Sequence, residues 1–245
     1  MRQCTESVNL WQQYEWDEKL SFIETLSNHQ VLSFDPSKDQ LMHNYGSLED
    51  FLRKYFSINI LQKIGLYNQM QFNLYRETHI PCVILDPTVF TFIVGKNRSA
   101  VTVNKHNDDF KRELGLILGF NPGLFMKTQF VLIRSNRNKR FNILDLVHEA
   151  THVTQNFSNR QSKDENYMEN IQEIEAFMNE ILAFKYLKPN SNFSAYIQYK
   201  ELHFNSKIPL TQHGYLNKIW DEVNGFEWWD MTPYRKQKII HGVFK

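Results

Sequence analysis

The chain has 245 residues, of which 42% are hydrophobic and 14% aromatic, and its formal net charge is +1. This composition is that of a globular protein with an ample core, in one large domain or one domain with two lobes. The small net charge gives no electrostatic argument for nucleic acid as a partner. Two cysteines, Cys4 and Cys82, are too few for a disulfide framework and favour a reducing compartment.

No targeting or membrane-spanning segment is predicted. The N-terminal residues lack the apolar stretch of a signal peptide. The longest apolar stretch, residues 83–94, is interrupted by Asp86 and Pro87, which is incompatible with a membrane span. We therefore expect a cytoplasmic protein without a membrane partner.

Helical and extended patterns alternate along the first half of the chain. Ser47, with Asp50 three residues later, has the form of a capping box at the start of a helix. The patterns predict helices over 10–26, 47–64 and 108–118, and strands over 70–76, 89–94, 100–103 and 128–134. From residue 186 onward the chain is predicted to be mainly helical.

The next predicted helix begins at Asn142, a good N-cap, with Asp145 three residues later as in a capping box. It contains the string H-E-x-x-H at residues 148–152. Two histidines four residues apart, His148 and His152, lie on one helical face, where both imidazoles can reach one Zn²⁺ at about 2.0–2.1 Å. Glu149 sits about 100° further round, where it can take a proton from zinc-bound water.

The rest of this helix supports a chemical role for the motif. On a helical wheel four ionisable side chains share one arc of about 100°, and they are Asp145, His148, Glu149 and His152. Apolar residues fill most of the remaining surface, so the helix is predicted to be buried on most sides. Ionisable groups on a buried helix are costly unless they are paired or bound to metal. The alternative is an ordinary helix whose histidines form hydrogen bonds at the surface.

At this motif the chain resembles the zincin metallopeptidases. One zincin class extends the motif to H-E-x-x-H-x-x-G-x-x-H, but this chain has Gln155 and Ser158 where that class needs glycine and histidine. That class is therefore excluded. The other class, the gluzincins, takes its third ligand from a glutamate on a second helix downstream.

A second helix is predicted over 167–187 from an apolar stripe at helical spacing. The wheel puts Glu175 at the edge of this stripe, as the one carboxylate that points inward. It puts Glu169, Glu173 and Glu180 on the solvent side. The string from Ile174 to Asn179 resembles the gluzincin E-A-x-x-[D/N] segment.

That resemblance implies Glu175 as the third metal ligand and Asn179 as an outer partner of a histidine. Glu173 is the alternative ligand if the helix is rotated from this estimate. Glu175 can also be a helix-edge residue paired with a lysine or arginine. Gluzincins add a histidine or tyrosine that donates to the oxyanion, and the candidates are His213, Tyr215 and Tyr167. His213 beside Gly214 suits a loop over the cleft, although each candidate can also be an ordinary, partly exposed residue.

Together these observations predict an α+β, zincin-like fold in a single domain. Its lobes would be a mixed-sheet lobe over 1–138 and a helical lobe over 139–245. In zincins an edge strand beside the cleft binds extended peptide, and either 100–103 or 130–135 could be that strand.

The resemblance implies a zinc-dependent peptidase with one Zn²⁺ per chain, a protein or peptide substrate and Glu149 as general base. A narrow-range endopeptidase is the favoured form. One alternative is a zincin-fold protein that binds zinc but is catalytically inactive and serves as a binding module. The other is a helical protein with a chance motif.

Overall fold

The structure is a computed structural model that describes residues 42–64, 66, 80–95, 98–103, 129–136, 141–157, 165–204, 208, 210–224 and 238–239. Within these ranges helices accompany a small mixed β-sheet, which confirms the predicted α+β class. The chain divides into two compact units, one of residues 1–48 with 79–141 and one of 49–78 with 142–245. The helices predicted over 10–26 and 108–118 and the strand over 70–76 lie outside the described residues.

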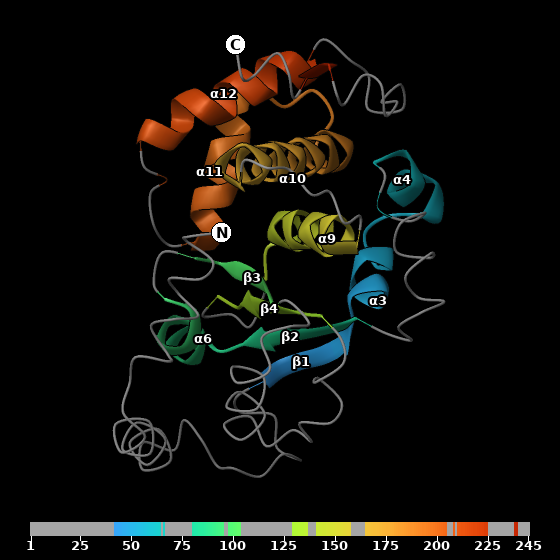
Figure 1. The fold of residues 1–245 in the computed structure, drawn as a ribbon, viewed down its shortest axis with the longest axis vertical. Coiled ribbons are helices and arrows are strands. Elements are labelled where there is room, and N and C mark those ends of the chain that lie inside the picture. Colours follow the sequence, from blue (N-terminus) through green and yellow to red (C-terminus); the bar gives the residue numbers. More distant parts are fainter. Residues whose placement is uncertain are drawn as a thin grey trace. The chain divides into compact units, whose positions relative to one another are not determined.

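The first unit contains a four-stranded sheet in the order β1-β2-β4-β3 (Figure 1). Strands β1 and β2 are antiparallel, β2 and β4 are parallel, and β3 and β4 are antiparallel. The central strands are almost entirely buried, as their continuous apolar sequences favour. The strand bounds are β1 Met42–Ser47, β2 Pro81–Leu85, β3 Ala100–Val103 and β4 Phe130–Arg134.

The sheet order decides between the two candidate edge strands. Strand β4 pairs on both sides, with β2 and with β3, so residues 130–134 are central. Strand β3 pairs with β4 alone among the described strands and lies at an edge. Of the two candidates, 100–103 is therefore the edge strand.

The strand predicted over 89–94 is wrong, because Pro87–Val94 forms helix α6. The Asp86 carboxylate accepts a hydrogen bond from Thr88 N at 2.8 Å, and Pro87 occupies the first turn. An aspartate N-cap followed by proline is a strong helix start that the apolar run concealed. The helix ends at Gly95, whose φ of 107° is rarely adopted by residues with a side chain.

The helix predicted over 47–64 is two short helices, α3 (Leu48–Arg53) and α4 (Ile58–Lys63). The first begins directly after Ser47, as the capping signal predicts. The second has its own N-cap, since Ser57 Oγ accepts a hydrogen bond from Ile60 N at 3.4 Å. Ser57 is therefore a second start signal, which divides the predicted helix in two.

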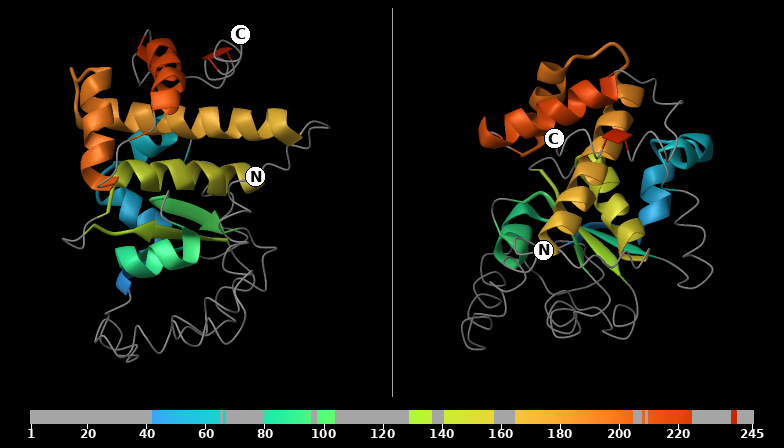
Figure 2. Two further views of the ribbon diagram at one scale, coloured as in Figure 1. Left: turned by 90° about the vertical axis from the view of Figure 1, so that its left-hand side faces the viewer. Right: turned by 45° about the horizontal axis from the view of Figure 1, so that its top comes forward.

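The second unit is built around two long helices, α9 (Ile143–Phe157) and α10 (Glu165–Leu187), close to their predicted bounds. Asn142 Oδ1 accepts a hydrogen bond from Leu144 N at 3.0 Å, which confirms the predicted N-cap. The two helices lie side by side and run in opposite directions (Figure 2). Accordingly Thr151 is joined to Asn179, whereas Gln155, one turn later, is joined to Gln172.

Helices α11 (Phe193–Phe204) and α12 (Leu210–Asn224) also belong to this unit and pack against α10. The ring centroids of Phe184 and Tyr196 lie 5.5 Å apart, and those of Tyr196 and Trp220 lie 5.8 Å apart. These three buried side chains join α10, α11 and α12 in one aromatic core. Within the described ranges, none of the helices has the length and apolar character that crossing a membrane requires.

Candidate metal centre

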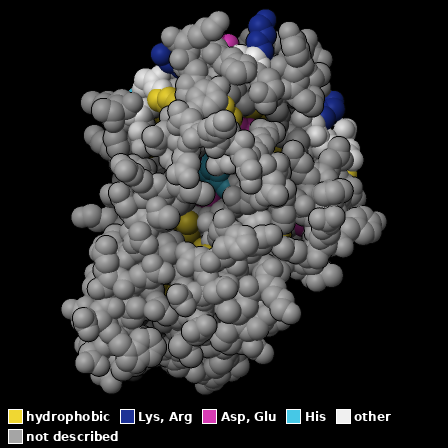
Figure 3. All heavy atoms as spheres, viewed as in Figure 1, with side chains coloured by type: hydrophobic (Ala, Val, Ile, Leu, Met, Phe, Trp, Pro, Cys, Tyr) yellow, Lys and Arg dark blue, Asp and Glu magenta, His cyan; other side chains and the backbone are white. Residues whose placement is uncertain are grey.

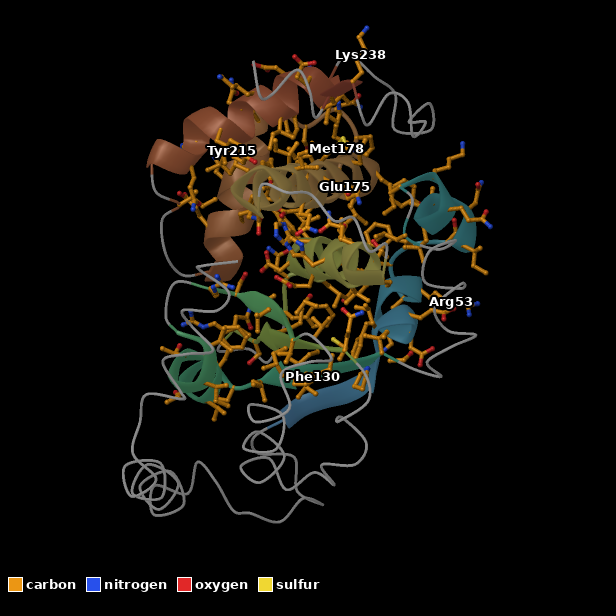
Figure 4. The ribbon with its side chains drawn as sticks, in the orientation of Figure 1. Arg53, Phe130, Glu175, Met178, Tyr215 and Lys238 are labelled. Carbon is orange, nitrogen blue, oxygen red and sulfur yellow. The ribbon has the colours of Figure 1, made fainter. Side chains whose placement is uncertain are left out.

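The two motif histidines meet a carboxylate from the neighbouring helix. His148 Nε2 and His152 Nε2 lie 3.1 Å apart on the face of α9 that is turned toward α10. Glu173 of α10 places Oε2 at 3.4 Å from His148 Nε2 and Oε1 at 3.4 Å from His152 Nε2. In the part of the chain that the structure describes, these three residues form the group of convergent side chains that could hold a metal ion. Figure 4 shows the polar atoms gathered between the two helices.

The donor separations fit a small tetrahedral cation. Donor bonds of about 2.0–2.1 Å at tetrahedral angles place the donor atoms about 3.3–3.4 Å apart. The separations of 3.1, 3.4 and 3.4 Å are close to this value. The side chains of His148 and His152 are 13% and 17% exposed, and that of Glu173 is 46% exposed, so solvent has access to the site. In the space-filling view, histidine atoms are visible at the surface (Figure 3).

The predicted third ligand, Glu175, does not belong to the group that converges on the two histidines. Its Oε2 accepts a hydrogen bond from Gln155 Nε2 at 3.0 Å, and the residue that converges with the histidines is the alternative, Glu173. The helical wheel predicted that Glu180 faces solvent. This prediction is wrong, because Glu180 is fully buried. Helix α10 is covered by α9 on one side and by α11 and α12 on others, so a single apolar stripe does not define its buried surface.

The ring of His152 is oriented by Gln155. The Gln155 amide nitrogen donates to Gln172 O at 2.9 Å and to Glu175 Oε2 at 3.0 Å, which uses both of its N–H groups. Its Oε1 is therefore the atom that faces His152 Nδ1 at 2.9 Å. Nδ1 must donate in this contact, which leaves Nε2 with a lone pair for a metal.

The ring of His148 faces a carboxylate that the sequence reasoning missed. His148 Nδ1 lies 3.3 Å from Glu180 Oε2. The predicted outer partner, Asn179, is buried and donates from Nδ2 to Thr151 Oγ1 at 3.0 Å. Glu173 and Glu180 are seven residues apart, which places them on the same face of the helix. This spacing is the sequence signal that both carboxylates lie near the same histidine.

Charge is concentrated around His148. Burial alone would lower the pKa of His148, but the carboxylates of Glu173, Glu180 and Glu149 outweigh burial and raise that pKa to about 10. Burial would raise the pKa of Glu173, but the two histidines hold it well below its usual range. The site therefore attracts positive charge strongly, as a proton or as a cation.

Glu180 belongs to a buried polar network that extends to α11. Its Oε1 accepts hydrogen bonds from Tyr196 Oη at 2.7 Å and from Lys200 Nζ, and Lys200 Nζ also lies 3.9 Å from Asp145 Oδ1. Burial opposes ionisation of both Glu180 and Lys200, but their mutual attraction lowers the pKa of Glu180 and raises that of Lys200. Such pairing is what makes buried charges tolerable.

The predicted base, Glu149, follows His148 on α9 and is 8% exposed. Its negative charge contributes to the raised pKa of His148, so its carboxylate acts on the same site. This position suits a residue that exchanges protons beside a metal without binding it.

The predicted loop at His213 and Gly214 is wrong, since both lie within helix α12. Two residues apart on a helix, His213 and Tyr215 point in directions about 200° apart. The Tyr215 ring contacts Phe177 at 6.1 Å between centroids, and Phe177 contacts the His148 ring at 4.6 Å. Burial, with a contribution from Glu173, raises the pKa of Tyr215, so its hydroxyl remains a donor.

The other two candidates are less well placed. Buried His213 Nε2 has no hydrogen-bond partner in the described part of the chain. Tyr167 lies in helix α10, and its side chain falls outside the described residues. Of the three candidates, Tyr215 is the one with a described connection to the histidines.

Comparison with models of known protein families, with curated proteins and with solved structures found no match to this chain. Two imidazole nitrogens and one carboxylate form a donor set that could hold a metal ion such as Zn²⁺.

Proposed function

We propose that this protein is a zinc-dependent peptidase with a zincin-like fold, in which His148, His152 and Glu173 hold one Zn²⁺ per chain. The observation that carries the proposal is the convergence of these three side chains at separations of 3.1–3.4 Å. Two further observations support it, namely the buried carboxyl partner of His148 and the amide partner of His152. Outer contacts of this kind orient metal-binding histidines in proteins.

The choice of Glu173 departs from the gluzincin resemblance, in which Glu175 is the ligand. Glu173 is favoured because its two oxygens face the two histidines, whereas Glu175 supports Gln155. The order of elements also supports a zincin-like fold. A mixed sheet precedes the motif helix in the chain, and an antiparallel helix with the third donor follows it.

A Zn²⁺ at this position would lower the pKa of water toward about 7 and polarise a peptide carbonyl. Glu149 is proposed to accept the proton of the attacking water and to pass it to the leaving amine. Tyr215 is proposed to donate a hydrogen bond to the developing oxyanion, since its hydroxyl remains protonated at neutral pH. The open side of the cluster, where Glu173 is half-exposed, is where a protein or peptide substrate would approach.

The test begins with the metal content of the full chain after dialysis, measured by elemental analysis for the wild type, His148→Ala and Glu149→Gln. We expect about one Zn²⁺ per wild-type chain, a large loss in His148→Ala and full retention in Glu149→Gln. A wild type that neither contains Zn²⁺ nor takes it up would overturn the proposal and leave a chance motif.

Cleavage is measured next, with a library of unstructured peptides analysed by mass spectrometry. We expect zinc-dependent cleavage by the wild type and none by Glu149→Gln, which keeps the metal. Zinc binding without cleavage of any peptide would instead support the alternative, a catalytically inactive zinc protein that acts as a binding module.

A further inference from the structure

The Glu180 carboxylate connects two helices through its two oxygens. Oε1 accepts hydrogen bonds from Tyr196 Oη at 2.7 Å and from Lys200 Nζ, both on α11. Oε2 has no hydrogen-bond donor among the described residues and faces His148 Nδ1 at 3.3 Å. The terminal torsion of glutamate has a broad, shallow profile, so its carboxylate plane is set by its partners. Here the partners that set it come from α11.

The contact with His148 has a defined direction. Nδ1 is buried and has no other hydrogen-bond partner in the described part of the chain. Because an ionised carboxylate oxygen only accepts, Nδ1 must be the donor in this contact. Once a metal ion has displaced the Nε2 proton, a histidine that donates from Nδ1 keeps the lone pair of Nε2 for that metal. Nε2 is the atom that faces His152 and Glu173.

A second contact leads from α11 to the same imidazole. Lys200 Nζ lies 5.3 Å from the centre of the Phe177 ring, and that ring meets the His148 ring at 4.6 Å and 66°. Lys200 therefore contacts two of the groups that border the His148 ring, the Glu180 carboxylate and the Phe177 ring. These contacts restrict rotation of the imidazole from two sides.

We propose that Lys200 and Tyr196 are positioning residues of the metal centre. They hold Glu180 Oε1, turn Oε2 toward His148 Nδ1, and so present His148 Nε2 to the metal. The inference rests on the proposed function, because it assigns α11 a role in the same site. A purely structural ion pair between α10 and α11 would stabilise the fold without changing metal affinity, and this difference can be measured.

The experiment measures the Kd for Zn²⁺ of the full chain by competition with a chromophoric chelator. The variants are Tyr196→Phe, Lys200→Met and Lys200→Arg. Loss of a partner behind a metal-binding histidine typically weakens affinity about 10- to 100-fold, and we expect about tenfold for Lys200→Met. Lys200→Arg should restore part of this loss because it returns a cationic donor to Glu180.

Lys185→Met is the matched control. Lys185 is on α10, donates to Asn224 Oδ1 at 2.7 Å and lies over the Trp220 ring. Its loss removes the same charge from the same unit without touching Glu180, so its Kd for Zn²⁺ should equal that of the wild type.

A spectroscopic measurement separates positioning from general destabilisation. In the zinc-loaded chain with ¹⁵N-labelled histidine, the His148 signals, assigned with His148→Gln, should show a protonated Nδ1 and a metal-bound Nε2. In Lys200→Met we expect the Nδ1 signal to shift or exchange faster with water, while the signals of His152, which Gln155 holds, stay in place.

The outcomes distinguish this inference from the proposed function. If the wild type binds no Zn²⁺, both fail together. If the wild type binds Zn²⁺ but Lys200→Met and Tyr196→Phe bind it as tightly, the positioning role alone is overturned. If Lys200→Met does not fold, Tyr196→Phe decides, since weaker binding supports the role and unchanged binding rejects it.

Discussion

Nε2 of His148 lies 3.1 Å from Nε2 of His152, and each of these nitrogens lies 3.4 Å from an oxygen of Glu173. Two imidazole lone pairs at this distance repel each other unless a proton or a metal ion lies between them. The negative charge of the surrounding carboxylates stabilises a proton or a metal ion at this position.

The first prediction concerns the third metal ligand. Glu173→Gln should greatly weaken Zn²⁺ binding, because the amide contributes no charge and is a poorer donor to the metal. Glu175→Gln should cause a smaller loss, since Glu175 acts through Gln155 on the ring of His152. Chelator competition gives the two Kd values. The reverse order would show that Glu175 is the ligand, as the gluzincin resemblance implies.

The second prediction concerns pH and metal binding. In the metal-free protein the pKa of His148 is raised from 6.5 to about 10, so the ring carries a proton at pH 8. Binding of Zn²⁺ through this ring must displace that proton. Calorimetric titrations at pH 8 in buffers of different ionisation enthalpy should therefore show release of about one proton per Zn²⁺ bound. Binding without proton release would contradict the assignment of His148 as a ligand.

The same pKa shift predicts a pH effect on the stability of the metal-free protein. A pKa raised in the folded state stabilises it fully below the unfolded value of 6.5. The contribution declines above pH 6.5 and is lost as the pH rises through about 10. Urea unfolding of chelator-treated protein at pH 6, 8 and 10 measures it. His148→Gln should remove this part of the pH dependence, and an unchanged profile in that variant would contradict the prediction.

The fourth prediction concerns the contact between α9 and α10. Asn179 Nδ2 donates to Thr151 Oγ1 at 3.0 Å, and Thr151 Oγ1 donates to Val147 O at 2.9 Å. Asn179→Leu should lower the free energy of unfolding by about 1–3 kcal/mol, because the buried hydroxyl of Thr151 loses its donor. Chemical denaturation measures the change. Adding Thr151→Val should recover part of it, and strictly additive losses would show that the two residues are not coupled.

The fifth prediction concerns Gly214, which lies within helix α12 and is exposed. A Cβ atom added there meets no heavy atom within 4 Å. Gly214→Ala should therefore raise the free energy of unfolding by about 0.5–1 kcal/mol, since alanine loses less backbone entropy in a helix. Zinc affinity should stay unchanged. A destabilised variant would indicate that this segment is not helical in solution.

The local sequence determined the elements that carry the motif. Asn142, an apolar run without glycine or proline, and the histidine spacing predict α9, while the stripe through Ile174 and Met178 predicts α10. These signals act within a few residues of one another, because capping, helical periodicity and side-chain spacing are local. The strand predicted over 89–94 is wrong, because Asp86 and Pro87 form an equally local start signal for a helix.

Only the tertiary structure decided which carboxylates serve the site. Neighbouring helices cover α10 on several sides, so hydrophobicity alone does not determine the directions in which its glutamates point. The approach of α9 directs Glu173 to both histidines, and α11 brings Lys200 and Tyr196 to Glu180. These pairings join residues far apart in the chain, and burial makes them necessary, since an unpaired charge in the core is costly. The motif therefore predicts a metal site, and the packing of α10 decides which carboxylates lie beside its histidines.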